Sequence, residues 1–195
     1  MNLYGKKIIL RAVEEEDIEM VRQRTNTPEF EEMVVGWTLP LSTKDQKEWY
    51  QGHKNDMNSI RFTIESKDDG AVGMIHIGEI DWKNGAIGKS SMRIDKKDVS
   101  SKGLATDAWM TLMKYIFDEL RLNRVAGSSL PHNTASLRVC EKVGFKIEGT
   151  LRQAVYKNGK FHDVIILGCT KEDYLQLIAN NHYWDECKPE IPGGE

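Results

Sequence analysis

The stretch from Met92 to Glu148 constrains the fold of this chain more than any other. A strand pattern ends near Asp95, a turn containing Gly103 follows, and a long amphipathic helix then extends to Leu120. Apolar residues recur along this helix at about every fourth position, which predicts that one face packs against a sheet. They are Leu104, Ala108, Leu112, Met113, Ile116, Phe117 and Leu120.

Hydrophobic alternation and turn residues predict the remaining elements. Strands are expected at residues 6–13, 61–65, 72–82, 86–95, 124–130, 145–156 and 161–169, and helices at 14–24, 43–55, 103–120 and 133–143. Residues 25–41 are expected to be irregular, and the apolar run Val164–Leu167 predicts a central strand. The order of elements predicts an α/β fold, a mixed sheet with helices on its faces.

Length and composition limit the class of protein. The 195 residues predict one domain, residues 1–187, with a polar tail at 188–195 that is expected to fray. The net charge of -3 gives no basic excess, so nucleic-acid binding is not expected. No apolar run is long enough for a signal peptide or a membrane span, so no membrane partner is expected.

Cysteine and histidine usage bears on location and metals. Cys140, Cys169 and Cys187 are odd in number and lack metal-type spacing, so we interpret them as reduced thiols in a cytoplasmic protein. The five histidines show no paired spacing. A metal site is therefore not expected.

The turn before the long helix has the composition of a phosphate-binding turn. Small residues let a pyrophosphate approach the backbone, and the helix N-terminus adds favourable electrostatics. The candidate residues are Ser100, Ser101, Lys102, Gly103, Leu104, Ala105 and Thr106. The alternative is a glycine-containing loop that merely starts a helix, and the segment lacks a nucleotide P-loop pattern.

A second, shorter helix carries polar groups on one stripe. At about 100° per residue, Asn133, Ser136 and Cys140 share one face, and Gly144 suits the helix end. These three side chains can therefore face one ligand together. The alternative is that Asn133 is a plain N-cap while the other two pack against the sheet.

Together these segments resemble the GNAT N-acetyltransferase superfamily, most closely its RimJ/RimL-type branch. The resemblance rests on K-G-L-A-T at 102–106, N-T-A-S at 133–136, E-G-T-L-R at 148–152 and H-D-V at 162–164. It implies a mostly antiparallel, splayed central sheet flanked by helices, with acetyl-CoA in a V-shaped gap. It also implies direct acetyl transfer to an amine, with no metal and no covalent enzyme intermediate.

The resemblance assigns roles to the cofactor-binding residues. Gly103 and Ala105 match the family pattern at the turn, whereas Ser100 stands where Arg or Gln is usual. Asn133 is expected to contact the pantetheine arm. Backbone N–H groups at Met92, Arg93 and Ile94 are expected to polarise the thioester carbonyl.

The resemblance also identifies candidates for proton transfer. Ser136 is the first candidate to protonate the leaving thiolate, and Cys140, which stands where many family members carry a Tyr, is the second. A primary alkylamine has a pKa near 10, so a base should help. Val155 stands where some RimJ/RimL-type enzymes carry a Glu, which leaves other candidates for this base: Glu79, Asp81, Glu31, Glu32 and His76.

The acceptor is left open. A protein N-terminus, a polyamine, an aminoglycoside and a nucleotide-linked amino sugar are the alternatives within this activity, since fold analogy cannot choose among them. A non-catalytic acyl-CoA-binding module is the alternative from another class. The final apolar strands can pair across two subunits, so a homodimer is a further expectation.

Overall fold

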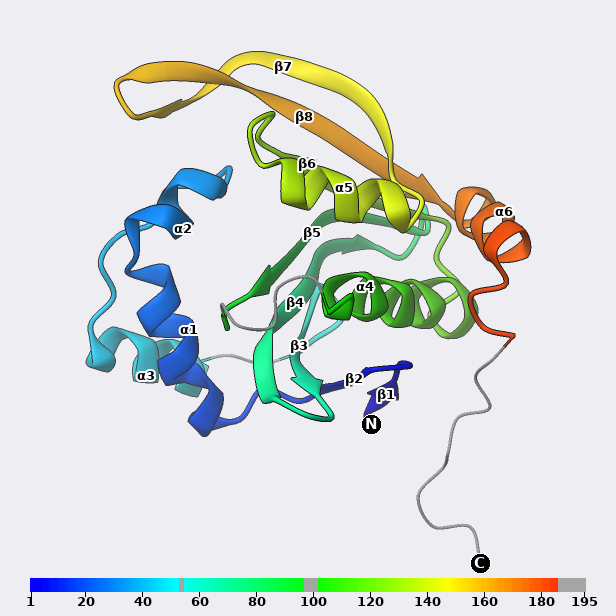
Figure 1. Ribbon diagram of the computed structural model, residues 1–195, viewed down its shortest axis with the longest axis horizontal. Coiled ribbons are helices and arrows are strands. Elements are labelled where there is room, and N and C mark those ends of the chain that lie inside the picture. Colours follow the sequence, from blue (N-terminus) through cyan, green and yellow to red (C-terminus); the bar gives the residue numbers. More distant parts are fainter. Residues whose placement is uncertain (53–54, 97–101, 186–195) are drawn as a thin grey trace, which may run out of the picture.

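The computed structural model describes residues 1–52, 55–96 and 102–185. An eight-stranded sheet runs through it in the order β1-β2-β3-β4-β5-β6-β8-β7 (Figure 1). Only the β5–β6 pair is parallel among these neighbours. The strands are β1 (Leu3–Tyr4), β2 (Ile8–Arg11), β3 (Ser59–Ser66), β4 (Gly70–Asp81), β5 (Ala86–Ile94), β6 (Arg124–Ser129), β7 (Lys146–Lys157) and β8 (Lys160–Thr170). The expected mixed, mostly antiparallel sheet is confirmed, and β8, which carries 164–167, is an inner strand.

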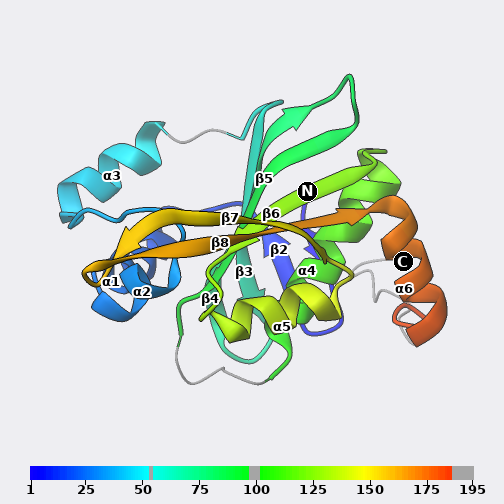
Figure 2. The same cartoon turned by 90° about the horizontal axis from the view of Figure 1, so that it is seen from above.

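Helices lie on both sides of this sheet. In Figure 2, α1, α2 and α3 lie to one side of β3, β4 and β5, and α4 lies to the other. The helix α4 contacts β1, β2 and β5, and α5 lies beside it. The helices are α1 (Ile18–Thr25), α2 (Pro28–Met33), α3 (Thr43–Gly52), α4 (Leu104–Lys114), α5 (Thr134–Lys142) and α6 (Lys171–Asn181). None of them is long and apolar enough to span a membrane.

Alternation along β4 explains why the sheet has two different faces. Ile75 and Ile77 are fully buried and join the hydrophobic core that includes α4. Because successive side chains point to opposite faces, Met74 and His76 face the side where α1 and α3 lie. One face of the strand therefore stabilises the fold, and the other lines a pocket.

The structure corrects the sequence prediction at several ends. The segment 25–41 is not wholly irregular: α2 begins at Pro28, and the Thr27 hydroxyl caps it by accepting from the Phe30 N–H at 3.3 Å. The helix expected from residue 14 starts as a 3₁₀ turn at Glu15–Asp17, and α4 continues as a π-helix over Tyr115–Glu119. Strand β1 and helix α6 were not predicted, and the tail at 188–195 lies outside the described residues.

The sheet parts between β5 and β6. These strands share only two Cα partners, Ala86 with Arg124 and Ile87 with Val125. Beyond them, the Ser90 hydroxyl donates to the Ala126 carbonyl at 2.6 Å, so a side chain takes the place of the next backbone bond. The hydroxyl lies 3.3 Å from where a Cβ on Gly127 would stand. The strands diverge from this point, as the expected splayed sheet requires.

A buried carboxylate fastens the first strands to α4. Asp107 is 2% exposed and accepts hydrogen bonds from three consecutive backbone N–H groups, the nearest that of Lys7 at 2.7 Å. The hydroxyl of Tyr183 donates to the same carboxylate at 2.6 Å. A Cβ on Gly5 would lie 2.6 Å from it, so a larger residue there would displace the carboxylate. The two ends of the described chain therefore meet at one helix residue.

Strand β7 forms one edge of the sheet and is largely exposed. Large apolar side chains of the β7–β8 hairpin are open to solvent; they are Ile147, Leu151, Tyr156 and Phe161. An exposed strand edge can pair with a second chain. The homodimer expected from the sequence would use this edge, and it stays a prediction.

Replacing Asp107 by Ala should lower the free energy of unfolding by about 3 kcal/mol, because several buried donors lose their acceptor at once. Chemical denaturation followed by circular dichroism measures this change. The control is Asp118→Ala, an exposed carboxylate in the segment that continues α4, with an expected change within about 0.5 kcal/mol. Equal effects of the two substitutions would contradict a fastening role for Asp107.

Candidate functional site

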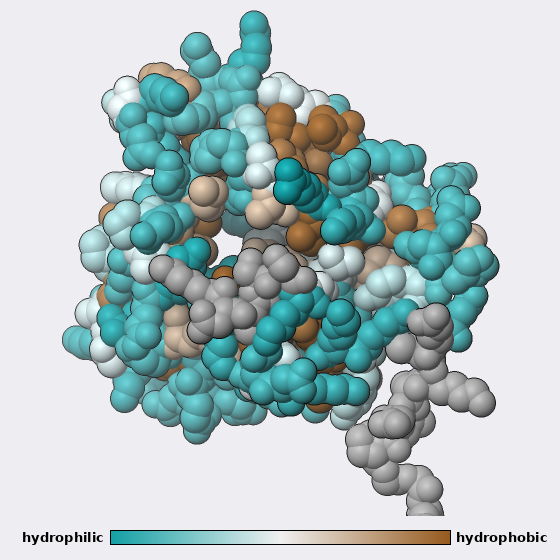
Figure 3. Space-filling model, viewed as in Figure 1, coloured by the Kyte–Doolittle hydropathy of each residue, from teal (hydrophilic) through white to brown (hydrophobic). Residues whose placement is uncertain are grey.

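Two cavities adjoin along β5. The larger has a volume of about 920 Å³ and lies where β5 and β6 part, and the smaller has about 430 Å³ and lies between α1–α3 and the strands β3–β5. The cavities share the lining residues Phe30, Val34, Ser91, Met92 and Arg93. Figure 3 shows the molecule hollowed between the side of α1 and α2 and the side of α4 and α5. A ligand in one cavity can therefore meet a ligand in the other at 91–93.

The larger cavity brings together most of the predicted cofactor-binding residues. Its wall on β5 includes a stretch with no strand partner toward β6, so backbone N–H groups there are available to a ligand. The predicted residues that line it are Met92, Arg93, Ile94, Gly103, Leu104, Ala105, Thr106, Asn133, Ser136 and Cys140. Ser100 and Ser101 lie outside the described residues.

Gly103 forms the N-cap of α4 at the floor of this cavity. Its φ is +80°, in the left-handed region that favours glycine. The first N–H groups of α4 therefore begin at the cavity, with the positive end of the helix dipole beside it. Lys102 does not line the cavity, because its ammonium pairs with Asp69 at 2.9 Å.

The larger cavity is strongly basic. Among the described residues, Asp95 alone contributes a carboxylate to its lining, and the buried Oδ2 atom of Asp95 has no hydrogen-bond partner there. The basic lining residues are Arg24, Lys89, Arg93, Lys96, Arg138 and Lys142. Cationic side chains and a helix N-terminus fit the phosphates of coenzyme A, and an orphaned acceptor fits a donor group of the same ligand.

Sequence reasoning missed most of these basic residues. A usable signal was present for Arg138 and Lys142, which stand four residues apart on α5, two and six positions after Ser136. Residues four positions apart, such as Arg138 and Lys142, lie on the same side of a helix. Arg24 and Lys89 had no such signal, because their position depends on how α1 and β5 pack.

The amide of Asn133 caps α5 and also lines the cavity. Its Oδ1 accepts from the Ser136 N–H at 3.1 Å, and its Nδ2 donates to the Met33 carbonyl at 2.9 Å. Asn133 is therefore the N-cap that the alternative predicted, and it also lies at the cavity. An asparagine amide has a further donor and acceptor site, so Asn133 can still bind a ligand.

Ser136 and Cys140 lie one helical turn apart and touch. Burial raises the pKa of the Cys140 thiol, and a hydrogen bond with the Ser136 side chain opposes that shift only in part. The thiol therefore stays protonated at neutral pH. The pair offers two protonated groups on one wall of the larger cavity.

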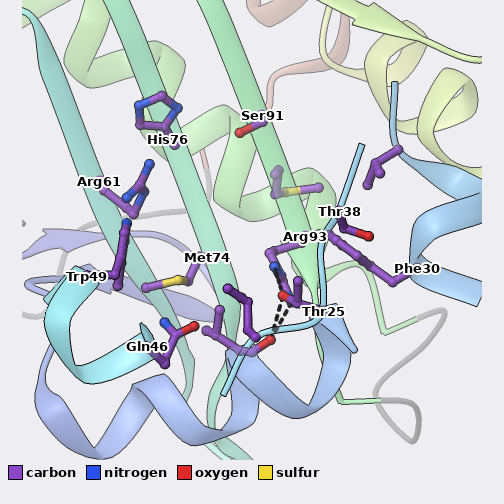
Figure 4. A pocket seen from close by; sticks show the side chains of 14 residues that line it. Thr25, Phe30, Thr38, Gln46, Trp49, Arg61, Met74, His76, Ser91 and Arg93 are labelled. Atoms are coloured by element: carbon purple, nitrogen blue, oxygen red, sulfur yellow. Dashed lines mark hydrogen bonds between the residues drawn. The ribbon is translucent and has the colours of Figure 1, made fainter. Parts of the chain in front are cut away.

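The smaller pocket combines aromatic, apolar and cationic side chains (Figure 4). The guanidinium of Arg93 is held by Asp95 at 2.7 Å, Thr25 at 2.9 Å and the Val21 carbonyl at 2.9 Å. The imidazole of His76 contacts the Ser59 hydroxyl at 3.0 Å. Arg93 therefore fixes α1 against β5, and His76 is the imidazole that the pocket presents.

Only one of the candidate bases lines either cavity. His76 does, whereas Glu79 is an exposed residue of β4 with a φ of 55° and lies outside both linings. Asp81 accepts from Asn84 in the β4–β5 turn. The carboxylate of Glu31 pairs with Lys157 at 2.7 Å, so it is committed to that contact.

The segment 28–36, which contains α2, bridges the two sides of the parted sheet. Lys157 at the end of β7 is 7% exposed and donates to the Glu31 carbonyl at 2.7 Å and to the Gly36 carbonyl at 2.9 Å. His132 contacts the Glu32 carbonyl at 2.9 Å, beside the Asn133 bond to Met33. Phe30 and Val34, which line both cavities, are thereby held in place.

No metal-binding arrangement is present in residues 1–52, 55–96 and 102–185, where no three His, Cys, Asp or Glu side chains converge.

Comparison with known proteins connects this geometry to a family. The family model described as an acetyltransferase (GNAT) domain matches residues 7–146. An uncharacterized, SPbeta prophage-derived N-acetyltransferase, YokL, of Bacillus subtilis (strain 168) is 28% identical over 170 residues, 87% of this chain and 93% of the relative. The spermidine N(1)-acetyltransferase of Escherichia coli (strain K12) is 27% identical over 172 residues, 85% of this chain and 87% of the relative.

The fold is also shared with a solved structure. The crystal structure of spermidine N-acetyltransferase from Vibrio cholerae, in complex with CoA and spermine, superposes with a TM-score of 0.78. The two sequences are 22% identical, and the match covers 88% of this chain and 99% of that one. At this identity the likeness concerns the fold.

Replacing both Arg138 and Lys142 by Gln should weaken acetyl-CoA binding about ten-fold, because two cations leave a cavity suited to phosphates. Calorimetric titration measures the affinity, and acetyl-pantetheine, which lacks the nucleotide phosphates, should lose much less. Lys83→Gln, an exposed lysine in the β4–β5 turn, is the control. Equal losses for both donors would show that the two side chains do not bind phosphate.

Proposed function

The chain belongs to the GNAT acetyltransferase family, and from that premise we propose that it transfers the acetyl group of acetyl-CoA to a primary amine by direct attack. The fold class, the acyltransferase class and the acetyl-CoA co-substrate expected from the sequence are thereby confirmed. One observation carries the proposal. The basic cavity and the smaller pocket meet at Ser91–Arg93, so a donor and an acceptor can each have a site.

The residues of the larger cavity hold and orient the donor. Acetyl-CoA supplies the acetyl group as a thioester. The N-terminus of α4, with Arg138 and Lys142, neutralises phosphate charge. Backbone N–H groups of β5 around Met92 stabilise negative charge on a carbonyl oxygen, as preorganised donors do in other acyl transfers.

Two side chains move protons in this proposal. His76, at the edge of the smaller pocket, takes a proton from the acceptor ammonium, since imidazole ordinarily titrates nearest to neutral pH. Ser136 gives a proton to the leaving thiolate and regains one from water, while His76 returns its proton to water; the protonated Cys140 thiol lies beside Ser136. The position of Glu79 outside both linings gives it no support as a base, so His76 replaces it.

The acceptor within this proposal is a small-molecule amine or a protein N-terminus. The names of similar proteins favour a polyamine as the second candidate, because one relative and one solved structure of the same fold are spermidine acetyltransferases. Nucleotide-linked amino sugars are a third. The RimJ/RimL-type branch and a cytoplasmic location stay predictions.

The test is release of free thiol from acetyl-CoA with a panel of polyamines, aminoglycosides, amino sugars and peptides with free N-termini, with mass spectrometry of the products. An acetylated amine that appears only with enzyme supports the proposal. Acetyl-CoA binding without acetylation of any amine would favour the non-catalytic acyl-CoA-binding module.

Replacing Ser136 by Ala should lower kcat by about 10²-fold, as expected for loss of a general acid, while the affinity for acetyl-CoA changes little. Steady-state kinetics with the best amine of the panel measure both. Cys140→Ala is the comparison and should lower kcat less. A variant of Ser136 with normal kcat, beside a Cys140 variant with a large loss, would reverse the two assignments.

Replacing His76 by Gln should lower kcat by about 10²-fold near neutral pH, and the loss should shrink at high pH, where the amine is already neutral. The pH profile of kcat/KM measures this. His162→Gln is the matched control, because His162 packs against His132 at a ring distance of 5.4 Å and lines neither cavity. A loss that is equal at every pH would mean that His76 acts only through packing.

A further inference from the structure

The smaller pocket, which the proposed function assigns to the acceptor, has an unusual balance of charge. Its ionisable lining residues are Arg61, Arg93 and His76, and no Asp or Glu lines it among the described residues. The charge of Arg93 is already paired with Asp95 at 2.7 Å. The pocket therefore presents positive charge to an acceptor.

Arg61 is the cation that has no such pair. Its backbone is fixed by Asn55, which accepts from the Arg61 N–H at 2.8 Å and donates to its carbonyl at 3.1 Å. The guanidinium lies over the ring of Trp49 at 5.1 Å from the centroid. No ion pair of Arg61 exists within the part of the chain that the structure describes.

Burial acts on this cation without compensation. It lowers the pKa of the Arg61 guanidinium below its usual value, and no carboxylate opposes the shift. Figure 4 shows the side chain beside Trp49 and near His76, on the side of the pocket away from Arg93. A planar guanidinium held against an aromatic ring is preorganised to bind a carboxylate or phosphate through two parallel hydrogen bonds.

The strand register gives the distance between this cation and the reaction centre. Arg61 on β3 is the Cα partner of His76 on β4, and His76 is the partner of Ser91 on β5. Neighbouring strands lie about 4.8 Å apart, so Arg61 and Ser91 are separated by roughly 10 Å at the backbone. Ser91 belongs to the stretch where the two cavities meet.

We propose that the acceptor of this enzyme is an amine that also carries an anionic group, a carboxylate or a phosphate, which Arg61 binds. This inference rests on the proposed function and narrows it to a substrate class. One row of side chains across three strands then serves one substrate: Arg61 binds its anion, and His76 and Ser91 face its amine end. A polycation would meet an uncompensated guanidinium and, among the described lining residues, no carboxylate.

Matched pairs of acceptors test the proposal. The pairs are 6-aminohexanoate with hexylamine and glucosamine 6-phosphate with glucosamine, and spermidine is added as the polycation. The anionic member of at least one pair should have a kcat/KM about ten-fold or more above its neutral partner. The carboxylate and phosphate pairs separate the two sources of the anion.

Variants assign the effect to the residue. Arg61→Gln should abolish the preference for the anionic member while changing the neutral member by less than about three-fold, and Arg61→Lys should keep part of it, since a point charge remains. Arg121→Gln, an exposed arginine just after the π-helical segment Tyr115–Glu119, is the control and should keep the full preference. Thermal denaturation confirms that each variant is folded.

Two results would overturn the inference: spermidine or the neutral amines acetylated as well as the anionic ones, or a preference that persists in Arg61→Gln. Both leave acetyl transfer itself intact. If no amine is acetylated, the proposed function fails instead. Calorimetric titration of the same pairs into wild type and Arg61→Gln then decides whether Arg61 binds the anion.

Discussion

The molecule depends on the point at which hydrogen bonding between β5 and β6 stops. A parallel pair that continued along both strands would close the sheet and leave no room for a cofactor. Pairing ends after Ile87 and Val125, and the Ser90 hydroxyl takes the next carbonyl, that of Ala126. The Ser90 side chain thus satisfies the Ala126 carbonyl, which would lack a hydrogen bond from the diverging strand. The two strands can therefore separate at this point without leaving that carbonyl unsatisfied.

Strand β5 then serves two cavities at once. Toward β6 it offers backbone groups, and toward α1–α3 it offers the side chains of Ser91 and Arg93. The two cavities differ in how their positive charge is arranged. The larger spreads its cations over several elements, as suits a ligand with several phosphates, whereas the smaller concentrates its unpaired charge at Arg61. Under the proposed function, the sites for donor and acceptor therefore differ in the arrangement of charge as well as in volume.

The parts that sequence predicted well are those that depend on local geometry. Gly103 needs a positive φ at the start of a helix, and Asn133 caps the next helix, so both were identified from their neighbours in the chain. Lys102 shows the limit of this reasoning. Lys102 lies in the turn before α4 that was predicted to bind phosphates. The β3–β4 turn, however, brings Asp69 close enough to pair with its ammonium. A pattern of residues does not reveal such a long-range partner.

The smaller pocket was harder to predict for the same reason. Arg61, His76 and Ser91 follow one another at intervals of fifteen positions, and only the register of three strands places them in one row. Glu79 lies on the same strand as His76, three residues further along. Its φ of 55° interrupts the regular strand geometry, and its side chain does not line the smaller pocket. The helix α2 was not predicted, because Pro28 was interpreted as a residue that breaks helices. In the structure Pro28 stands in the first turn of α2, where proline is favourable.

The bridging segment 28–36 also has a consequence for the order in which the chain folds. Strands β3, β4 and β5 are joined by short turns, so they can pair through local contacts. The bridge is held by His132, Asn133 and Lys157, which lie about a hundred residues or more further along. It cannot settle until the β6–β8 half is in place. Phe30 and Val34, the residues of this segment that line both cavities, therefore depend for their position on contacts with residues 132–157.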